Sequence, residues 1–435
     1  MSAKIAQHLP VFPLAPEAVH VIGAPAEFRE ALSQGIRKAR KRIVLASLYI
    51  GTSETRLVTE LAEALAANAD LELHVLVDFF RGHRSDSGGS STATMLDPLL
   101  GRFPGRRFNE VFGLQHIKAY VFDDDVIISG ANLSSDYFTT RQDRYVLFKD
   151  CSDLASFFSS LVNVLADLSP LLKHASGSRK TATIPQARTI LTEFWEHWLA
   201  KTSDARQIVL ADIPPQSLAR VRRPCTFAAP AIQLGVAGIR FDEAAMLTVF
   251  KELQSDAAPS VTIASGYLNI PDRYKRQLLE SKADINIVCS SPEANGFFNS
   301  RGVSRYIPHA YSYLEFCFFR DLTTLNKRAP VRLAEYFRTG WTWHAKGVWL
   351  GPRKSDALPW FASVVGSSNL NQRSLERDVE AQVYIFSRDS ALRNRFAQNL
   401  DQLQKHTRAV GLPELRQRRI PALVKICARM LRTMF

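Results

Sequence analysis

Three features that define common classes of protein are missing from this 435-residue sequence. Its five cysteines form no Cys-x-x-Cys pair, which argues against a zinc site or a disulfide framework and favours a reducing compartment. No segment approaches the roughly 20 apolar residues that a membrane-spanning helix needs, so any membrane contact is expected to be peripheral. The first residues show neither a secretory hydrophobic region nor an arginine-rich amphipathic presequence.

Acidic residues are outnumbered by basic ones, 42 to 55, which gives a formal net charge of +13. This balance favours an anionic partner: nucleic acid, acidic lipid or a phosphorylated substrate. The hydrophobic fraction of 46% and the charged fraction of 22% are those of a globular protein, which excludes a disordered or fibrous chain.

An internal repeat of long period decides the fold prediction. Each copy is expected to run helix, strand, helix, strand, and the first strand of each copy leads into a polar-aromatic turn. These elements are predicted at 26–39, 42–51, 57–67 and 71–80 in the first copy, and at 241–255, 261–270, 273–281 and 283–292 in the second. Strands that alternate with helices predict an α/β protein.

The likeness of the two copies is closest further along the chain. Each copy has a His-x-Lys pair, a predicted strand hairpin, an asparagine after glycine, and an acidic residue: His116, Lys118, Asn132 and Asp143, then His344, Lys346, Asn369 and Glu380. The asparagine and the acid are eleven residues apart in both copies (143 minus 132, and 380 minus 369). The second hairpin is nine residues longer (237 minus 228), and the insertion falls in the loop-like segment 351–360.

We therefore predict an α/β protein with two pseudo-symmetric halves, each a mixed, mostly parallel sheet flanked by helices, and one active site at their interface. The predicted division is an N-terminal extension (1–20), a first half (21–174), a linker and helical connection (175–238), a second half (239–410) and a basic amphipathic C-terminal helix (411–435). Helical spacing is found at 152–174 and 187–200, and the hydrophilic segment 175–183 between them is interpreted as a linker.

A His-x-Lys pair on a strand places both side chains on one face, because strand side chains alternate with period two. A neutral imidazole beside an ammonium suits attack on a phosphate: one His attacks phosphorus and the other works as acid and base. Asn132 and Asn369 would donate to phosphoryl oxygens, while Asp143 and Glu380 would each accept from an imidazole N–H. No metal and no cofactor are expected, because lysine cations oppose a divalent ion.

These residues carry a family resemblance. HIKAYVFD (116–123) resembles the complete HxKxxxxD signature of the phospholipase D superfamily, and HAKGVWLG (344–351) is a second copy with Gly351 in place of the acid. Asp123 completes the first motif, either as a support of the site or as a turn residue. Five further stretches, VLASLYIGT (44–52), DFFRG (78–82), RFNEVFGLQHIK (107–118), SPEANGFFNSRGV (291–303) and GWTWHAKG (340–347), resemble the eukaryotic-type phosphatidylglycerophosphate synthases. A departure is the short passage 99–110.

The resemblance implies transfer of a phosphatidyl group from CDP-diacylglycerol to the 1-hydroxyl of sn-glycerol 3-phosphate, with release of CMP, through a phosphatidyl-histidine. By superfamily analogy His116 is the expected nucleophile and His344 the acid and base. It also implies a mitochondrial protein, peripheral on the inner membrane. Both substrates are anionic, so cations and polar groups near the motifs are candidate substrate-binding residues: Arg81, Arg141, Arg373, Tyr49, Tyr267 and Ser367.

The segment 416–435 has apolar residues at helical spacing with basic residues beside them, which is typical of a helix that lies on an anionic membrane surface. Its apolar stripe, Ile420, Leu423, Val424, Cys427, Leu431 and Met434, could instead pack on the protein body. A phospholipase, a phosphatidylserine or cardiolipin synthase, and a nuclease remain alternatives. The nuclease is disfavoured because no groove of interleaved aromatic and basic residues is evident, so no nucleic acid is expected as partner. The oligomeric state stays undetermined.

Overall fold

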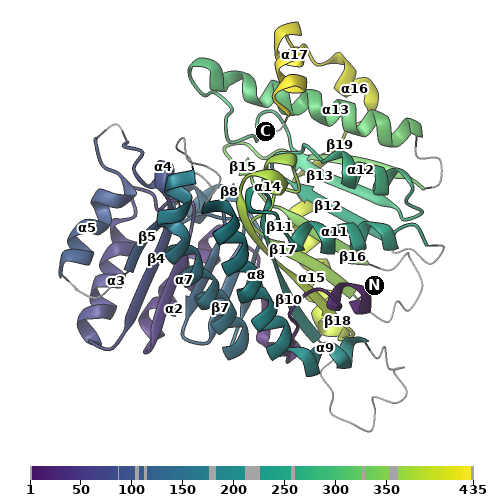
Figure 1. Ribbon diagram of the computed structural model, residues 1–435. Helices are drawn as coiled ribbons and strands as arrows, with labels where there is room; N and C mark the ends of the chain where they lie inside the picture. Colours follow the sequence, from purple (N-terminus) through teal and green to yellow (C-terminus); the bar gives the residue numbers. More distant parts are fainter. Residues whose placement is uncertain are drawn as a thin grey trace.

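The computed structural model describes residues 2–86, 88–102, 107–111, 115–175, 183–210, 226–255, 260–325, 329–351 and 361–432. Two mixed sheets lie side by side, each with helices packed on it, and each contains the strands of one copy of the repeat (Figure 1). The predicted linker 175–183 lies almost entirely outside the described residues, as do nearly all of the insertion 351–360 and part of the passage 99–110.

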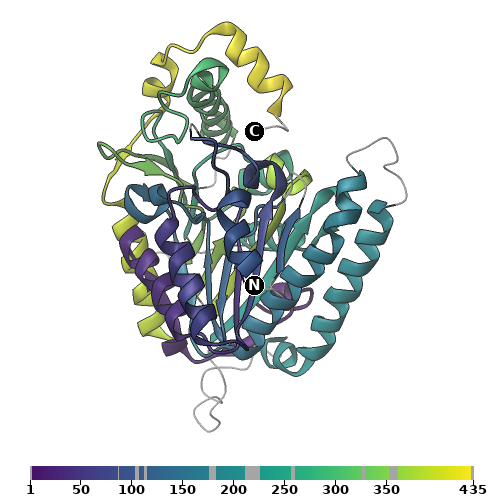
Figure 2. The same ribbon diagram turned by 90° about the vertical axis from the view of Figure 1, so that its left-hand side faces the viewer.

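The first sheet has seven strands in the order β2-β9-β7-β6-β3-β4-β5. They are β2 (Val19–Ile22), β9 (Tyr145–Phe148), β7 (Asp125–Ser129), β6 (Ala119–Phe122), β3 (Arg42–Ala46), β4 (Glu72–Asp78) and β5 (Arg107–Val111). Helices α2 (Pro25–Lys38) and α3 (Thr55–Ala67) pack on one face with their apolar stripes of Phe, Leu and Ile. Helix α7 (Ser152–Ala175) packs on the other face, and Figure 2 shows the sheet between these two helical layers.

The second sheet has the order β1-β10-β18-β17-β16-β12-β13-β14-β19. Its strands are β1 (Phe12–Leu14), β10 (Thr226–Leu234), β18 (Val379–Ser387), β17 (Phe361–Gly366), β16 (Gly347–Gly351), β12 (Ser260–Ser265), β13 (Ile285–Ser290), β14 (Val331–Tyr336) and β19 (Thr407–Ala409), with β11 (Ile239–Arg240) paired to β10. Around it lie α11 (Phe241–Glu252), α12 (Asp272–Leu279), α13 (Ile307–Leu325) and α15 (Ser390–Gln404). The helices and strands predicted in both copies of the repeat are confirmed, with ends that differ by a few residues.

The prediction of mostly parallel sheets is wrong. Only β3-β4-β5 and β12-β13-β14 are parallel runs; every other pairing described within the two sheets is antiparallel. The reason is the short connection after each His-x-Lys segment, since a hairpin joins antiparallel strands whereas a parallel pair needs a long crossover. The hairpins are β6-β7 and β16-β17.

Two segments outside the predicted halves contribute to the second sheet. Strand β1, within the predicted N-terminal extension, pairs with β10, and β10 itself comes from the predicted connection and pairs with β18 along its whole length. Helices α8 (Thr183–Lys201) and α9 (Ser203–Leu210) precede β10, and α8 packs against α7. The apolar side chains of these segments belong to one core that spans both halves.

The C-terminal segment is not one helix but two, α16 (Leu412–Gln417) and α17 (Ala422–Met430). Pro421 caps α17, and a proline lacks the N–H that a continuous helix would need. Ile420, Val424 and Ala428 pack on α13, so part of the predicted apolar stripe covers the protein body. Leu423, Ile426, Met430 and Leu431 are exposed instead, and Met434 lies outside the described residues.

Candidate active site

The two His-x-Lys segments lie directly before strands β6 and β16, not on them as predicted. Each is held by the backbone of the opposite half. The N–H of His116 donates to the carbonyl of Val379 (3.0 Å), and the N–H of His344 donates to the carbonyl of Gln142 (2.8 Å). Val379 and Gln142 each precede the acidic residue of their own copy, so each histidine is placed beside the acid of the other copy.

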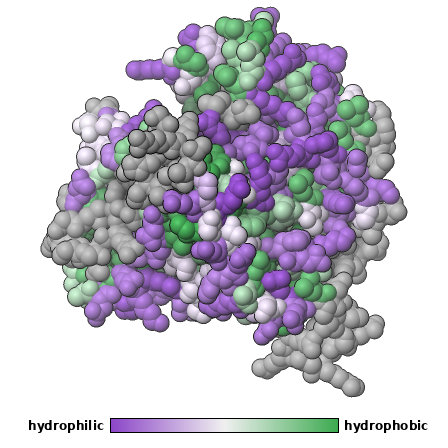
Figure 3. All heavy atoms as spheres, in the orientation of Figure 1, coloured by the Kyte–Doolittle hydropathy of each residue, from purple (hydrophilic) through white to green (hydrophobic). Residues whose placement is uncertain are grey.

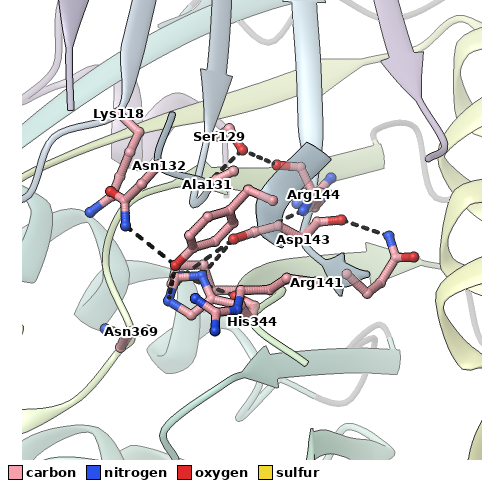
Figure 4. Close-up of polar contacts among 12 residues, drawn as sticks. Lys118, Ser129, Ala131, Asn132, Arg141, Asp143, Arg144, His344 and Asn369 are labelled. Atoms are coloured by element: carbon pink, nitrogen blue, oxygen red, sulfur yellow. Dashed lines mark hydrogen bonds and ion pairs between the residues drawn. The ribbon is translucent and has the colours of Figure 1, made fainter. Parts of the chain in front are cut away.

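Both histidines are paired with a carboxylate across the interface of the halves. Nδ1 of His344 lies 2.6 Å from a carboxylate oxygen of Asp143 (Figure 4), and Nδ1 of His116 lies 3.0 Å from both oxygens of Glu380. An Nδ1–H that donates to a carboxylate leaves Nε2 as the basic nitrogen. The hydroxyl of Ser374 donates to Glu380 (2.6 Å) and so holds that carboxylate in position.

The two lysines are buried behind the histidines. The ammonium of Lys118 donates to the carbonyl of His116 (2.7 Å), and that of Lys346 donates to the carbonyl of His344 (2.9 Å). Lys346 also lies 3.8 Å from the Asp143 carboxylate. Gly130 faces this pair: a Cβ at that position would lie 2.6 Å from Asp143 and 2.7 Å from Lys346, so the packing of the buried ion pair requires glycine here.

Burial controls the protonation of these groups. It lowers the pKa of both His116 and His344 well below the usual value, and the neighbouring lysines lower it further. Burial also lowers the pKa of Lys118 to about 7 and raises that of Asp143 to about 6. Both imidazoles are therefore neutral near pH 7, which is the state required of a nucleophile and of a base.

The two predicted asparagines line the same cavity as the histidines. Asn132 accepts from the N–H of Leu48 (3.3 Å) and donates to the Tyr137 hydroxyl (3.3 Å). Tyr137 is in turn 3.3 Å from Nε2 of His344, to which its O–H donates. Asn132, Tyr137, His344 and Asp143 thus form a hydrogen-bonded chain within the first half and across the interface (Figure 4). The buried Oδ1 of Asn369 has no hydrogen-bond partner among the described residues.

A cavity of about 560 Å³ lies between the halves. Five of the six predicted substrate-binding residues line it: Arg81, Arg141, Arg373, Tyr49 and Tyr267. Its polar wall carries three guanidinium groups beside two neutral imidazoles, so the cavity can hold an anionic ligand against a histidine nitrogen.

Two predicted site residues lie elsewhere. Asp123 is in the tight turn after β6, at φ 54°, and its carboxylate accepts from the backbone N–H groups of Arg40, Lys41 and Arg42. It therefore fixes the start of β3, at the end of β6 opposite to His116. Ser367 is buried, and its hydroxyl accepts from the backbone N–H of Ala381 (3.1 Å), so it supports the strand that carries Glu380 and does not line the cavity.

Several lining residues were not predicted from the sequence: Tyr137, Asp378, Asp78, Gln115 and Tyr311. Tyr137 and Asp378 lie within the segments that join the predicted asparagine to the predicted acid in each copy. That position is the sequence signal that could have identified them. Because Tyr137 and Asp378 have no matching residue type in the other copy, a search for repeated residues misses them.

Two His-x-Lys segments, each oriented by a carboxylate of the other half, converge on one cavity, which is the arrangement that the resemblance to the phospholipase D superfamily implies. Relatives named CDP-diacylglycerol--glycerol-3-phosphate 3-phosphatidyltransferase are 36% identical in chicken (Gallus gallus) and 35% identical in human (Homo sapiens), over 98% of this chain and 85% and 84% of those proteins. The relative from Saccharomyces pastorianus is 31% identical over 97% of this chain and 88% of its own length. The chain belongs to the CDP-diacylglycerol--glycerol-3-phosphate 3-phosphatidyltransferase family.

The fold agrees with a solved structure. A phosphatidylserine synthase from Haemophilus influenzae superposes with a TM-score of 0.73 over 100% of this chain and 99% of that one, at 21% sequence identity. At that identity the likeness concerns the fold alone. No protein-family model matches the chain.

Proposed function

We propose that this protein transfers the phosphatidyl group of CDP-diacylglycerol to sn-glycerol 3-phosphate, giving phosphatidylglycerophosphate and CMP. The observation that carries the proposal is the pair of crossed His–carboxylate contacts at one arginine-lined cavity, in a chain that aligns with phosphatidyltransferases over 98% of its length. One histidine can hold the phosphatidyl group while the other activates the acceptor, so one site carries out both halves of the transfer.

In the first step, Nε2 of His116 attacks the phosphorus that carries the diacylglycerol. A nitrogen–phosphorus bond forms, the bond from this phosphorus to the bridging oxygen breaks, and CMP leaves with the electron pair. The imidazole becomes cationic, and Glu380 at 3.0 Å from Nδ1 stabilises that charge. Since CMP leaves as a phosphate anion, this step requires little proton donation from the neutral His344.

In the second step, the 1-hydroxyl oxygen of glycerol 3-phosphate attacks the same phosphorus. Nε2 of His344 takes the hydroxyl proton, the nitrogen–phosphorus bond breaks, and His116 is regenerated. His344 then releases this proton to the solvent and is neutral again. The acceptor hydroxyl must replace the Tyr137 O–H, which occupies Nε2 of His344 in the free site. Asp143 holds the imidazole by Nδ1 throughout.

The choice of His116 as nucleophile rests on its surroundings as well as on the superfamily analogy. Its Nε2 has no hydrogen-bond partner among the described residues, whereas that of His344 is bonded to Tyr137. The His116 side chain is also the more exposed of the two, 14% against 7%. A nitrogen that must form a bond to phosphorus needs an open approach.

Product identification tests the proposal against its alternatives. Purified protein is given CDP-diacylglycerol in detergent micelles with radiolabelled glycerol 3-phosphate, with serine, or with water alone. Phosphatidylglycerophosphate together with CMP is the expected result. Phosphatidylserine would identify a serine transferase, and phosphatidate in all three arms would identify a hydrolase, so either of these results contradicts the proposal.

We further infer that the C-terminal segment contacts an anionic membrane. Within the described ranges, no helix is both long and apolar enough to cross a bilayer. Helix α17 exposes Leu423, Ile426 and Met430, and exposed Arg419 and Arg429 lie close to them in the sequence, which is the composition of an interfacial helix. Deleting 416–435 is expected to abolish binding to anionic vesicles at low salt, and unchanged binding would refute this inference.

The predicted mitochondrial location agrees with the names of the chicken and human relatives, both of which carry the word mitochondrial. We propose the same compartment for this chain. Fractionation of the cells that produce it, with the protein followed by antibody, is the direct measurement.

A further inference from the structure

The segment Gly296–Tyr306, named the mouth loop, joins the cavity wall at both ends and is exposed between them. Gly296 and Phe297 line the cavity, as does Ile307 directly after the loop. Between these points Phe298 is 46% exposed and Val303 is 84% exposed, the highest value among the exposed large apolar residues described. Apolar side chains at the tip of a loop gain nothing from the fold in water, so they favour a role in contact with another phase or molecule.

The backbone of the mouth loop holds this exposed position. Asn299 and Gly302 both have left-handed φ values, 60° and 63°, which are typical of tight turns. A Cβ on Gly302 would meet no atom within 4 Å, so the turn stands clear of the body. A short 3-10 helix, η3 (Gly302–Tyr306), then leads into α13, where Tyr311 lines the cavity.

Basic side chains flank the apolar tip. Arg301 and Arg305 are exposed on either side of Val303, and the Arg305 guanidinium lies over the ring of Tyr306 at 4.8 Å. Apolar residues between exposed arginines match a bilayer surface, which places acyl chains below a layer of phosphate groups.

Two other elements expose apolar residues close to the mouth loop. Phe80, from α4 (Phe79–Gly82) in the first half, lines the cavity and is 57% exposed. Helix α17 packs on α13, which begins where the mouth loop ends, and it exposes Leu423 and Met430. Figure 1 places α17 beside α13 at one end of the molecule, and Figure 3 shows apolar side chains on the surface there, next to hydrophilic ones.

We propose that the mouth loop inserts into the surface layer of an anionic lipid bilayer, with Phe298 and Val303 among the acyl chains and Arg301 and Arg305 at the lipid phosphates. The cavity then opens onto the membrane, and a diacyl substrate reaches His116 without leaving the bilayer. This inference rests on the proposed function for its meaning, because only a substrate with acyl chains requires such an entrance. The contact of the mouth loop with the membrane is measured separately from that of α17.

Insertion is measured directly with a tryptophan at the tip of the loop. The Val303→Trp variant is mixed with phosphatidylcholine–phosphatidylglycerol vesicles whose acyl chains carry bromine, which quenches fluorescence at short range. Fluorescence at position 303 is expected to be quenched relative to unbrominated vesicles by more than the wild-type background. The matched control is Ile190→Trp, because Ile190 is an exposed apolar residue of α8, away from the cavity. Equal quenching of both variants, or of neither, overturns the proposal.

A kinetic experiment tests whether insertion of the mouth loop is needed for activity on a substrate held in the membrane. In the Phe298→Asp/Val303→Asp variant, activity on long-chain CDP-diacylglycerol in anionic vesicles is expected to fall about tenfold or more, because each carboxylate opposes insertion. Activity on a short-chain, water-soluble CDP-diacylglycerol is expected to stay within about twofold, since neither side chain lines the cavity. Val236→Asp, an exposed apolar position in η2 (Gly235–Ala237), is the control that is expected to retain both activities.

An equal loss on both substrates would contradict the proposal, because it would show that the loop shapes the cavity or the fold. Failure of the wild-type protein to release CMP from either substrate would refute the proposed function instead. The quenching of Val303→Trp still decides the membrane contact in that case. If the aspartate variant does not fold, Val303→Ser, which adds no charge, replaces it in the same comparison.

Discussion

The two halves of the site can be compared position by position, counting from Asn132 and Asn369. Four residues further stand Asp136 and Arg373, and nine residues further stand Arg141 and Asp378. Each half therefore has an ion pair at the same two positions, with the charges exchanged: Arg141–Asp136 at 3.2 Å and Arg373–Asp378 at 2.9 Å. Arg141, Arg373 and Asp378 line the cavity.

The exchange gives the two histidines opposite surroundings. Burial lowers the pKa of both, but Asp378 raises the pKa of His116 while Arg141 lowers that of His344. A nucleophile that becomes cationic benefits from a nearby carboxylate, and a base that receives an anionic acceptor benefits from a nearby guanidinium. The two copies thus share the residues that orient the histidines and differ in the charges at these two positions, three of which line the cavity.

The strongest test of unequal roles removes the histidines one at a time. His116→Ala is expected to lower CMP release by at least about 1000-fold, because no nitrogen attacks the phosphorus. His344→Ala is expected to release one equivalent of CMP and then stop as a phosphatidyl-histidine, detected by single-turnover labelling. If His116→Ala forms the labelled intermediate and His344→Ala does not, the roles are reversed.

Loss of one carboxylate separates the two steps. Asp143→Asn and Glu380→Gln are each expected to lower overall turnover about 100-fold, because the imidazole loses the group that fixes its Nδ1–H. Exchange of labelled CMP into CDP-diacylglycerol, which reports the first step alone, is expected to fall with Glu380→Gln much more than with Asp143→Asn. Equal losses of exchange would contradict the separation of roles.

Because Arg and Asp stand at opposite positions in the two copies, Arg141 is the guanidinium expected to bind the acceptor. Arg141→Leu is expected to raise KM for glycerol 3-phosphate about 10- to 100-fold, the loss of one charged hydrogen bond to its phosphate, with a smaller change in KM for CDP-diacylglycerol. The control is Arg338→Leu, because Arg338 lies over the ring of Trp341 and does not line the cavity. A larger change in KM for the CDP-diacylglycerol would assign Arg141 to the donor.

The pH dependence of activity should distinguish the effect of Arg141 on His344 from that of Asp378 on His116. Activity needs neutral histidines, so it falls as pH drops through their pKa values, which lie well below the usual value. Arg141→Leu removes a charge that lowers the pKa of His344, so the acid limb is expected to move to higher pH. Asp378→Asn removes a charge that raises the pKa of His116, so the acid limb of this variant's profile is expected to move to lower pH. Shifts in the same direction would contradict the assignment.

The smallest expected effect concerns the motif acid that only the first copy has. Asp123→Ala is expected to lower the free energy of unfolding by about 1 to 2 kcal/mol, because three backbone N–H groups lose their acceptor. Urea denaturation measures the loss, and turnover of the folded variant is expected to stay within about twofold. A loss of turnover without a loss of stability would instead show that Asp123 supports the active site.

Most elements of the fold could be predicted from the sequence, because the repeat shows them twice with the same spacing. The pairing of the strands could not: β10 and β1 lie far from β18 in sequence, and their place in the second sheet depends on long-range contacts. The C-terminal segment was predicted as one helix because its periodicity continues through Pro421, and the packing of Val424 and Ala428 on α13 became visible only in the structure.

By itself, the sequence determined which residues recur: two histidines, two lysines, two asparagines and two acids at repeated spacing, the pattern from which we predicted a phosphotransfer site with two imidazoles. Only the tertiary structure decided which acid serves which histidine, because the backbone contacts of His116 to Val379 and His344 to Gln142 cross between the halves. It also decided that Asp123 and Ser367 support strands, and that Tyr137, Arg141 and Asp378 face the cavity. Spacing along a chain records which residues recur, whereas contact depends on how two separate sheets are packed together.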